Sequence, residues 1–379
     1  MAQALILISA SPGEVRTALV QGGVLTEAWI ERPAHPDGVG DLHRGRVVAI
    51  APAMAGAFVA LAGDKTGFLP ESEASAERRP IAAAVNEGMI LPLRVTRAAQ
   101  GGKGPRLTAR LTAAEAARVA AAPPGAPVLV ARGPTAAERL ARRHPAAAVL
   151  IDNAALAARL RPRLGEDPRL VPRAFDEDTE AAFDALAEAE APLPGGGRLL
   201  VHPTPALTAI DMDMGGAPGA LSALNRAALP ELARQIRLRN LAGAILVDFA
   251  GLSAKRRAAL EAPLRESLAA DRHARLLGFT HLGLAEIVRD RIHPPLHEVL
   301  GLPPSPLTRG LAALRQAARE AAARPAIALR LRATPAVIAA LRDLPGALEE
   351  FAASAGRPVA LFADPAAPAP QIEEAPNGN

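Results

Sequence analysis

Two short apolar runs that each end in an aspartate limit most strongly what this chain can fold into. Leu207–Ile210 precedes Asp211, and Ala244–Val247 precedes Asp248. Short apolar runs closed by turn signals are typical of core strands. A Gly/Pro turn follows the first aspartate, and apolar residues then recur at helical spacing from 229 to 236. The stretch therefore predicts a strand, a helix and a second strand, the connection that makes neighbouring strands parallel.

Parallel strands joined in this way end at the same edge of a sheet, so we expect Asp211 and Asp248 to lie close together. Neighbouring carboxylates are costly unless they share a proton or a cation, and hard oxygen ligands suit Mg²⁺ or Mn²⁺. Asp213 returns to the same side if its strand continues and would add a third carboxylate. The alternative is that these aspartates only cap helices or turns.

Composition limits the classes of function. The chain has 379 residues, enough for two or three domains, and its net charge of +4 with a pI near 10.4 permits a polyanionic partner. Arginine outnumbers lysine along the whole chain, so arginine richness alone does not indicate a function. The absence of cysteine excludes disulfides, thiolate metal sites and cysteine catalysis. We see no signal peptide and no membrane-spanning run, and therefore expect a cytoplasmic protein without a membrane partner.

The segment from Leu42 to Leu111 is rich in short strands broken by Gly and Pro. This pattern suits a small five-stranded barrel of the oligonucleotide-binding type, which holds single strands with aromatic faces and a basic rim. Phe58, Phe68 and Lys103, the last in a Gly-rich loop, are the candidate RNA-binding residues. The alternative for Phe58 is an ordinary core position.

The remaining pattern indicates α/β structure. Residues 1–35 predict a strand and a hairpin, and 112–160 alternate between helix and strand, with 127–131 as a scaffold strand. An acidic helix with a solvated face is expected from 178 onward. Residues 282–292 predict an amphipathic helix. A proline-rich linker at 301–305 leads into a compact α+β unit.

Several phrases occur in an order that is similar to one family. They are HRGRVVAIAPAMAGAFVALAGDKTGFLP (43–70), KGPRLT (103–108), VLIDN (149–153), LTAID (207–211), RQIRLRNLAGAILVDF (234–249) and LGLAEIVRDRIHPPL (282–296). Together they resemble the ribonuclease E/G endoribonucleases over most of residues 3–365. The two central phrases around the aspartates are the most specific.

The resemblance implies a fold class of α/β with a small β-barrel: an S1 (OB-like) barrel inserted in an RNase H-like scaffold, a DNase I-like catalytic domain and a C-terminal α+β small domain. The implied domains are the scaffold (1–40 and 112–195), the S1 barrel (41–111), the catalytic domain (196–300), the small domain (306–365) and a disordered tail (366–379).

For the site, the resemblance implies that Asp211 and Asp248 hold a catalytic Mg²⁺, with Mn²⁺ possible. The position of Asp213 is normally an asparagine that orients the first aspartate, and here an acid replaces it. The turn MGGAPG after Asp213 also lacks a basic residue that relatives have there. The implied reaction is metal-assisted hydrolysis of single-stranded RNA that leaves a 5′-phosphate and a 3′-hydroxyl.

Two other functions stay open at this point. The replaced asparagine and the lost basic turn suggest a catalytically weak or inactive RNA-binding relative. A DNA nuclease is the second alternative, since two carboxylates and a metal do not identify the sugar. The scattered histidines do not form a metal-free ribonuclease pair.

Two accessory features of the family are expected to be missing. Without cysteine, no thiolate zinc link can join protomers, so we expect no zinc, and dimerisation through the small domain stays open. The insert that senses a 5′-monophosphate is reduced to residues 112–126, where Arg118 is the only basic residue. Arg132 and Thr135 mimic the sensor's pair only superficially, and His273 replaces a further basic position at best in part.

Overall fold

The computed structural model describes residues 4–375 except 76, 78, 126, 166, 217, 218 and 250. Contacts divide the chain into two compact units, and each is described by itself. One contains Asp37–Thr135 and Arg291–Pro294; the other contains Met1–Pro36, Ala136–Asp290 and Pro295–Asn379. Among the described helices, none combines the length and the apolar character that a membrane crossing needs.

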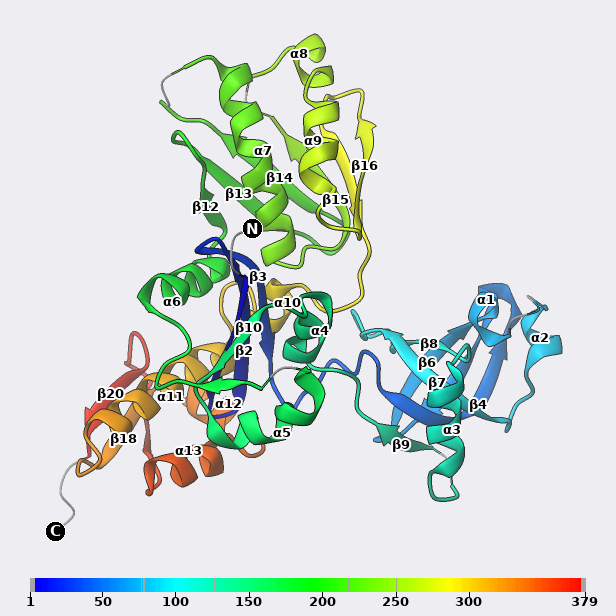
Figure 1. The fold of residues 1–379 in the computed structure, drawn as a ribbon, viewed down its shortest axis with the longest axis horizontal. Coiled ribbons are helices and arrows are strands. Elements are labelled where there is room, and N and C mark those ends of the chain that lie inside the picture. The colour runs from blue at the N-terminus through cyan, green and yellow to red at the C-terminus, as the bar shows by residue number, and fades with distance from the viewer. Residues whose placement is uncertain are drawn as a thin grey trace. The chain divides into compact units, whose positions relative to one another are not determined.

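The smaller unit is built on a closed barrel of five strands in the order β5-β6-β8-β7-β4, closed by pairing of β4 with β5 (Figure 1). The expected small five-stranded barrel is confirmed. Its interior is filled by fully buried side chains such as Val59, Leu93 and Leu107. The elements are β4 (Leu42–Ala51), η1 (Pro52–Met54), β5 (Gly56–Leu61), β6 (Lys65–Pro70), α1 (Glu71–Ala74), α2 (Ile81–Ala84), β7 (Ile90–Arg97) and β8 (Arg106–Thr108).

A further strand joins this barrel. β9 (Val128–Ala131) pairs with residues 42–44 of β4. β5 pairs with β4 only from Arg46 onward. The expectation that this segment belongs to the α/β scaffold is wrong. The physical reason is the length of β4, whose first residues would otherwise leave one edge unpaired. The helix α3 (Ala113–Ala121) precedes β9 and begins with a capping box formed by Thr112 and Glu115.

The larger unit contains a five-stranded sheet in the order β11-β10-β1-β2-β3. The expected N-terminal strand is its central strand β1, and the expected hairpin is formed by β2 and the edge strand β3. One face packs against α4 and α5, and the other against residues around α6 and α10. The elements are β1 (Ala4–Ser11), β2 (Glu14–Gln21), β3 (Val24–Glu31), α4 (Ala136–Arg143), β10 (Ala148–Ile151), α5 (Ala154–Leu164), β11 (Arg169–Leu170), α6 (Glu177–Asp184), η2 (Ala185–Ala187) and α10 (Leu296–Leu300).

The second sheet of this unit has six strands in the order β12-β13-β14-β15-β17-β16. Its core lies on the face covered by α7 and α9, which Figure 1 shows lying along the strands. The elements are β12 (Glu190–Pro192), β13 (Arg198–Pro203), β14 (Thr208–Asp213), α7 (Leu221–Leu238), β15 (Gly243–Asp248), α8 (Ala254–Ala258), α9 (Glu261–Leu268), β16 (Ala274–Phe279) and β17 (Ala285–Arg289).

β17 corrects the helix expected over residues 282–292. Along β17 the inward positions are Ala285, Ile287 and Arg289, so one charged side chain faces the core. Arg289 is stabilised there by Asp271, whose Oδ2 accepts from Nε at 2.7 Å. A buried ion pair thus interrupts the apolar alternation by which a strand is recognised.

The third sheet has the order β19-β18-β20 and packs on three helices. The elements are α11 (Pro306–Ala323), β18 (Leu329–Ala333), α12 (Pro335–Arg342), α13 (Ala347–Ala355), β19 (Ala360–Ala363) and β20 (Gln371–Glu374). The disordered tail expected from 366 is therefore wrong up to 375, and 376–379 lie outside the described residues. β20 is held because Arg330 pairs with Glu373 and Arg324 with Glu374.

Candidate functional site

The two aspartates that end β14 and β15 are direct partners in the sheet. The strands are parallel, and Asp211 lies opposite Asp248, after Ile210 opposite Val247. Neighbouring strands lie about 4.8 Å apart, so the two carboxylates start from adjacent backbone positions. α7 is the crossover that brings them together, as the sequence pattern predicts.

Both side chains lie on the face of the sheet opposite α7 and α9. Ile210 and Met212 are buried in the core under these helices, so alternation directs Asp211 to the other face. Asp248 follows buried Val247 in the same way, and its side chain is 53% exposed. The pair is therefore accessible to a large ligand such as a nucleic acid.

Asp213 shares this face but binds elsewhere. It lies opposite Arg198 of β13, whose Nε donates to its Oδ2 at 3.2 Å, while the Gly215 N–H donates to Oδ1 at 2.8 Å. The Gly215 hydrogen bond and the Arg198 guanidinium together hold the pKa of Asp213 below its ordinary value. Arg198 also contacts Glu190 at 3.2 Å. The third carboxylate is thus engaged by a cation rather than added to the pair.

The donor set decides which metal could bind. Within the described part of the chain, no three His, Cys, Asp or Glu side chains come together as a metal cage. Mg²⁺ retains several waters and is commonly bound by one or two carboxylates together with substrate phosphate oxygens. Two exposed, cross-strand aspartates fit that requirement.

The barrel carries an aromatic pair on its outer surface. Phe58 of β5 lies opposite Phe68 of β6, with ring centroids 5.5 Å apart and planes at 63°. Their neighbours Val59 and Leu69 point into the barrel core, and both rings are only half-buried. This geometry favours a binding surface over a core position for Phe58. Gly56 lets the Phe68 ring lie close, since a Cβ there would be 2.2 Å from it.

Basic residues flank the aromatic pair. Arg106 of β8 lies opposite Phe68 and is exposed, whereas its neighbour Leu107 is fully buried. The loop that carries exposed Lys103 ends next to β6, because the Phe68 N–H donates to the Pro105 carbonyl at 2.8 Å. Sequence reasoning missed Arg106. Its position one residue before a buried Leu in a strand was the available signal.

The residues that resemble parts of a 5′-end sensor belong to two different units. Arg118 is exposed on α3, in the barrel unit. Arg132 donates to Asp41 at 2.7 Å. His273, in the other unit, lies 3.7 Å from Asp290 and accepts from the Arg272 Nε at 3.2 Å. Thr135 lies in the connection that leads to α4.

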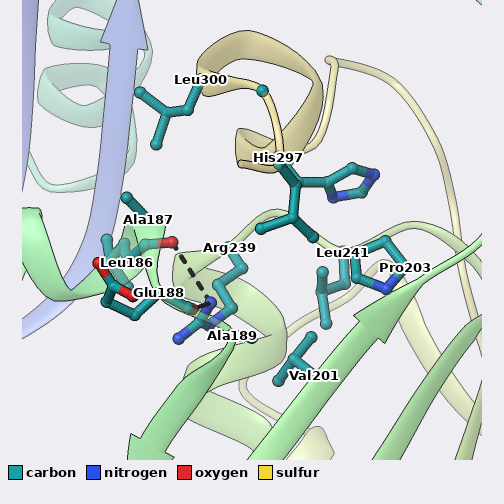
Figure 2. Close-up of a pocket in the computed structure, with 12 residues that line it drawn as sticks. Leu186, Ala187, Glu188, Ala189, Val201, Pro203, Arg239, Leu241, His297 and Leu300 are labelled. Carbon is teal, nitrogen blue, oxygen red and sulfur yellow. Dashed lines mark hydrogen bonds between the residues drawn. The ribbon is translucent and has the colours of Figure 1, made fainter. Parts of the chain in front are cut away.

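A small cavity of about 20 Å³ lies beside Arg239. Figure 2 shows the side chains that line it, which are largely apolar, such as Val201, Leu241 and Leu300. Arg239 donates to the carbonyls of Leu186 and Glu188, and burial lowers its pKa to about 10. The volume suffices for about one water molecule. The cavity is therefore a structural feature and is too small for a nucleotide.

The fold and site define a class: a mixed α/β protein with a small closed barrel and an exposed pair of aspartates on neighbouring parallel strands. Comparison with known proteins is more specific. Residues 165–292 match the model of the Ribonuclease E/G family. The chain is 27% identical to Ribonuclease G of Escherichia coli (strain K12) over 400 residues, which cover 78% of this chain and 81% of the relative.

Two further relatives carry names of the same family. Ribonuclease E of the same strain is 26% identical over 386 residues, 75% of this chain and 36% of that protein. Ribonuclease E of Nostoc sp. is 36% identical over 128 residues, 31% of this chain and 19% of that protein. Together these matches support the ribonuclease E/G family for this chain.

Proposed function

We propose that the chain is an endoribonuclease that hydrolyses single-stranded RNA with Mg²⁺ held by Asp211 and Asp248. The observation that carries the proposal is the direct pairing of these two exposed aspartates across β14 and β15. Membership of the family supports the endoribonuclease class and a role in RNA processing.

The chain's own residues have separate tasks in this proposal. Asp211 and Asp248 would hold Mg²⁺, or Mn²⁺, on the exposed face of the sheet. The bound ion would lower the pKa of a water and neutralise charge on the scissile phosphate. Arg198 keeps the Asp213 carboxylate oriented toward β13. In this proposal Asp213 therefore does not bind the metal and affects the site only as a nearby charge.

The barrel holds the RNA in this proposal. Phe58 and Phe68 offer faces on which bases stack, and Lys103 and Arg106 contact phosphates beside them. Such binding tolerates many sequences, because every base has a face to stack and every nucleotide a phosphate.

The finer layout also belongs to the proposal. The barrel would be an S1 domain, the sheet containing β1 an RNase H-like scaffold, and the sheet with the aspartates a DNase I-like catalytic domain. The enzyme would act in the cytoplasm without zinc, as a monomer or as a homodimer through the unit formed by α11–β20.

The test uses one fluorescent single-stranded RNA and a DNA of the same sequence, each incubated with the full chain in Mg²⁺ and in EDTA. We expect internal cleavage of the RNA in Mg²⁺ only. Equal cleavage of the DNA would indicate a general nuclease, and intact RNA in both Mg²⁺ and Mn²⁺ would refute the enzyme.

A second candidate is a relative that binds RNA with little or no cleavage. The ion pair between Asp213 and Arg198 favours it, as does an acid at a position where the family resemblance implies an asparagine. In that case RNA would bind the chain, by fluorescence anisotropy, but stay intact under the same conditions.

A further inference from the structure

The helix that follows Asp248 contains three successive basic residues, and one of them turns toward the aspartate. α8 carries Lys255, Arg256 and Arg257. The first two are exposed, but the Arg257 side chain is only 23% exposed. Its Nη2 lies 4.0 Å from Oδ1 of Asp248. The fold therefore places one guanidinium beside a proposed metal ligand.

A glycine makes room for this guanidinium. Gly283 lies in the turn between β16 and β17 with φ +85°, and a Cβ there would come within 2.2 Å of Arg257 Nη1. The same nitrogen donates to the Leu282 carbonyl at 3.5 Å. Arg257 is thus packed against the turn, and this packing limits the directions in which its guanidinium can point.

Most of the donor capacity of Arg257 is unused. A guanidinium has five N–H donors, and the contact with Leu282 is long. The 4.0 Å separation from Asp248 exceeds a hydrogen bond. Nε is buried and has no hydrogen-bond partner within the described residues. An unpaired buried donor costs free energy in the protein. The Nη2 that lies nearest Asp248 is the nitrogen placed to contact a ligand at the aspartates.

The charge balance indicates which ligand would do so. Two aspartates and one divalent cation are together neutral, so a phosphodiester brought to them adds an uncompensated negative charge. The planar fork of arginine suits phosphate oxygens. The turn after Asp213, MGGAPG, contains no basic residue that could fill this role.

We propose that Arg257 binds the phosphate of the RNA at the Asp211–Asp248 site, replacing from α8 a cation that the turn after Asp213 does not provide. This inference rests on the proposed function for its substrate. It predicts a role for Arg257 that Lys255 and Arg256, which face solvent, do not share.

The test compares the full-length wild type with Arg257→Ala, Arg257→Lys and, as a matched loss of charge, Arg256→Ala. For a short fluorescent RNA we expect Arg257→Ala to lower kcat/KM at least tenfold, as loss of a charge-stabilising donor does. Arg257→Lys should recover part of the loss, and Arg256→Ala should stay within about twofold of wild type. The Mg²⁺ concentration for half-maximal rate should not change, because Arg257 serves the phosphate rather than the metal.

A binding measurement separates this inference from the proposed function. RNA affinity is measured in EDTA at several salt concentrations. All variants also carry Phe68→Ala, which weakens the contribution of the barrel to RNA binding. Loss of one phosphate contact should lower the salt slope by about 0.7 for Arg257→Ala and leave it unchanged for Arg256→Ala. An unchanged slope for Arg257→Ala would overturn the inference even if the wild type cleaves RNA. If the wild type does not cleave RNA, a lower salt slope for Arg257→Ala would still support the inference and would refute only the enzyme.

Two kinetic outcomes would also overturn it. One is Arg257→Ala cleaving at the wild-type rate. The other is a loss accompanied by a changed Mg²⁺ requirement and equal for Arg257→Lys and Arg257→Ala, which would mean that Arg257 only supports Asp248.

Discussion

The Arg16 guanidinium on β2 lies 2.7 Å from the Glu180 carboxylate on α6, and both side chains are almost fully buried. Arg16 also lies over the rings of Phe175 and Phe183, at 5.0 and 5.7 Å from their centroids. Arg319 of α11 donates to the same glutamate at 2.5 Å. This cluster ties α11 to the first sheet, so the acidic helix has a structural role as well as a solvated face.

We expect Glu180→Gln to lower the free energy of unfolding by about 3–5 kcal/mol, because removal of the Glu180 charge leaves the buried Arg16 guanidinium without its nearest carboxylate. Urea unfolding of the full chain measures this. Glu177→Gln, on the exposed side of the same helix, is the control and should change stability by no more than about 0.5 kcal/mol. Equal changes in the free energy of unfolding for the two variants would mean that the cluster does not contribute to stability.

The ionisation of Glu180 should also make the stability of the fold depend on pH. Burial raises the pKa of Glu180, but Arg16 and Arg319 outweigh it and hold the pKa below the ordinary 4.5. The stability that this pair contributes is therefore full above pH 4.5 and is lost as the pH falls through the folded-state pKa. Burial raises the pKa of neighbouring Asp184, which acts in the opposite sense. Melting temperatures from pH 7 to pH 3.5 should fall less steeply for Glu180→Gln than for wild type.

Asp213→Asn tests whether the acid impairs the site. The amide would keep a hydrogen bond near Gly215 and Arg198 but would remove a negative charge that holds Arg198 away from substrate. We expect kcat to rise a few-fold. A loss of activity at unchanged RNA affinity would instead make Asp213 a ligand in its own right.

Phe68→Ala should weaken RNA binding about tenfold or more, since stacking contributes roughly 1–3 kcal/mol per base. Phe68→Leu is the matched control for packing and should keep the stability but not the affinity. Lys103→Ala should mainly lower the salt slope, by about one unit at most. A Phe68→Ala protein that binds RNA normally yet melts earlier would assign Phe68 to the core.

The 5′ end of the RNA should matter little. In place of a sensor insert the chain has α3, whose C-terminal carbonyls at Val119 and Ala122 accept from Arg44. Arg132 is already engaged by Asp41. Cleavage rates on 5′-monophosphate, 5′-triphosphate and 5′-hydroxyl versions of one RNA should agree within a small factor. A tenfold preference for the monophosphate would reveal a sensor elsewhere.

Sequence reasoning succeeded where a local pattern carried the information. The β14–α7–β15 connection follows from apolar periodicity, and with it the meeting of Asp211 and Asp248. It failed where distant partners decide the outcome. Arg289 is buried because Asp271, Asn240 and the Leu241 carbonyl accept its hydrogen bonds. β20 is ordered because β18 offers it an edge and an arginine. The position of Arg257 on α8 depends on Gly283, which lies in the β16–β17 turn.

The most direct test of the central claim is Mg²⁺-dependent cleavage of single-stranded RNA by Asp211→Asn and Asp248→Asn. Both side chains are exposed, so neither change leaves a cavity, and folding and RNA binding should stay close to wild type. We expect cleavage to be abolished in each variant at every Mg²⁺ concentration. Wild-type cleavage by either one would contradict it.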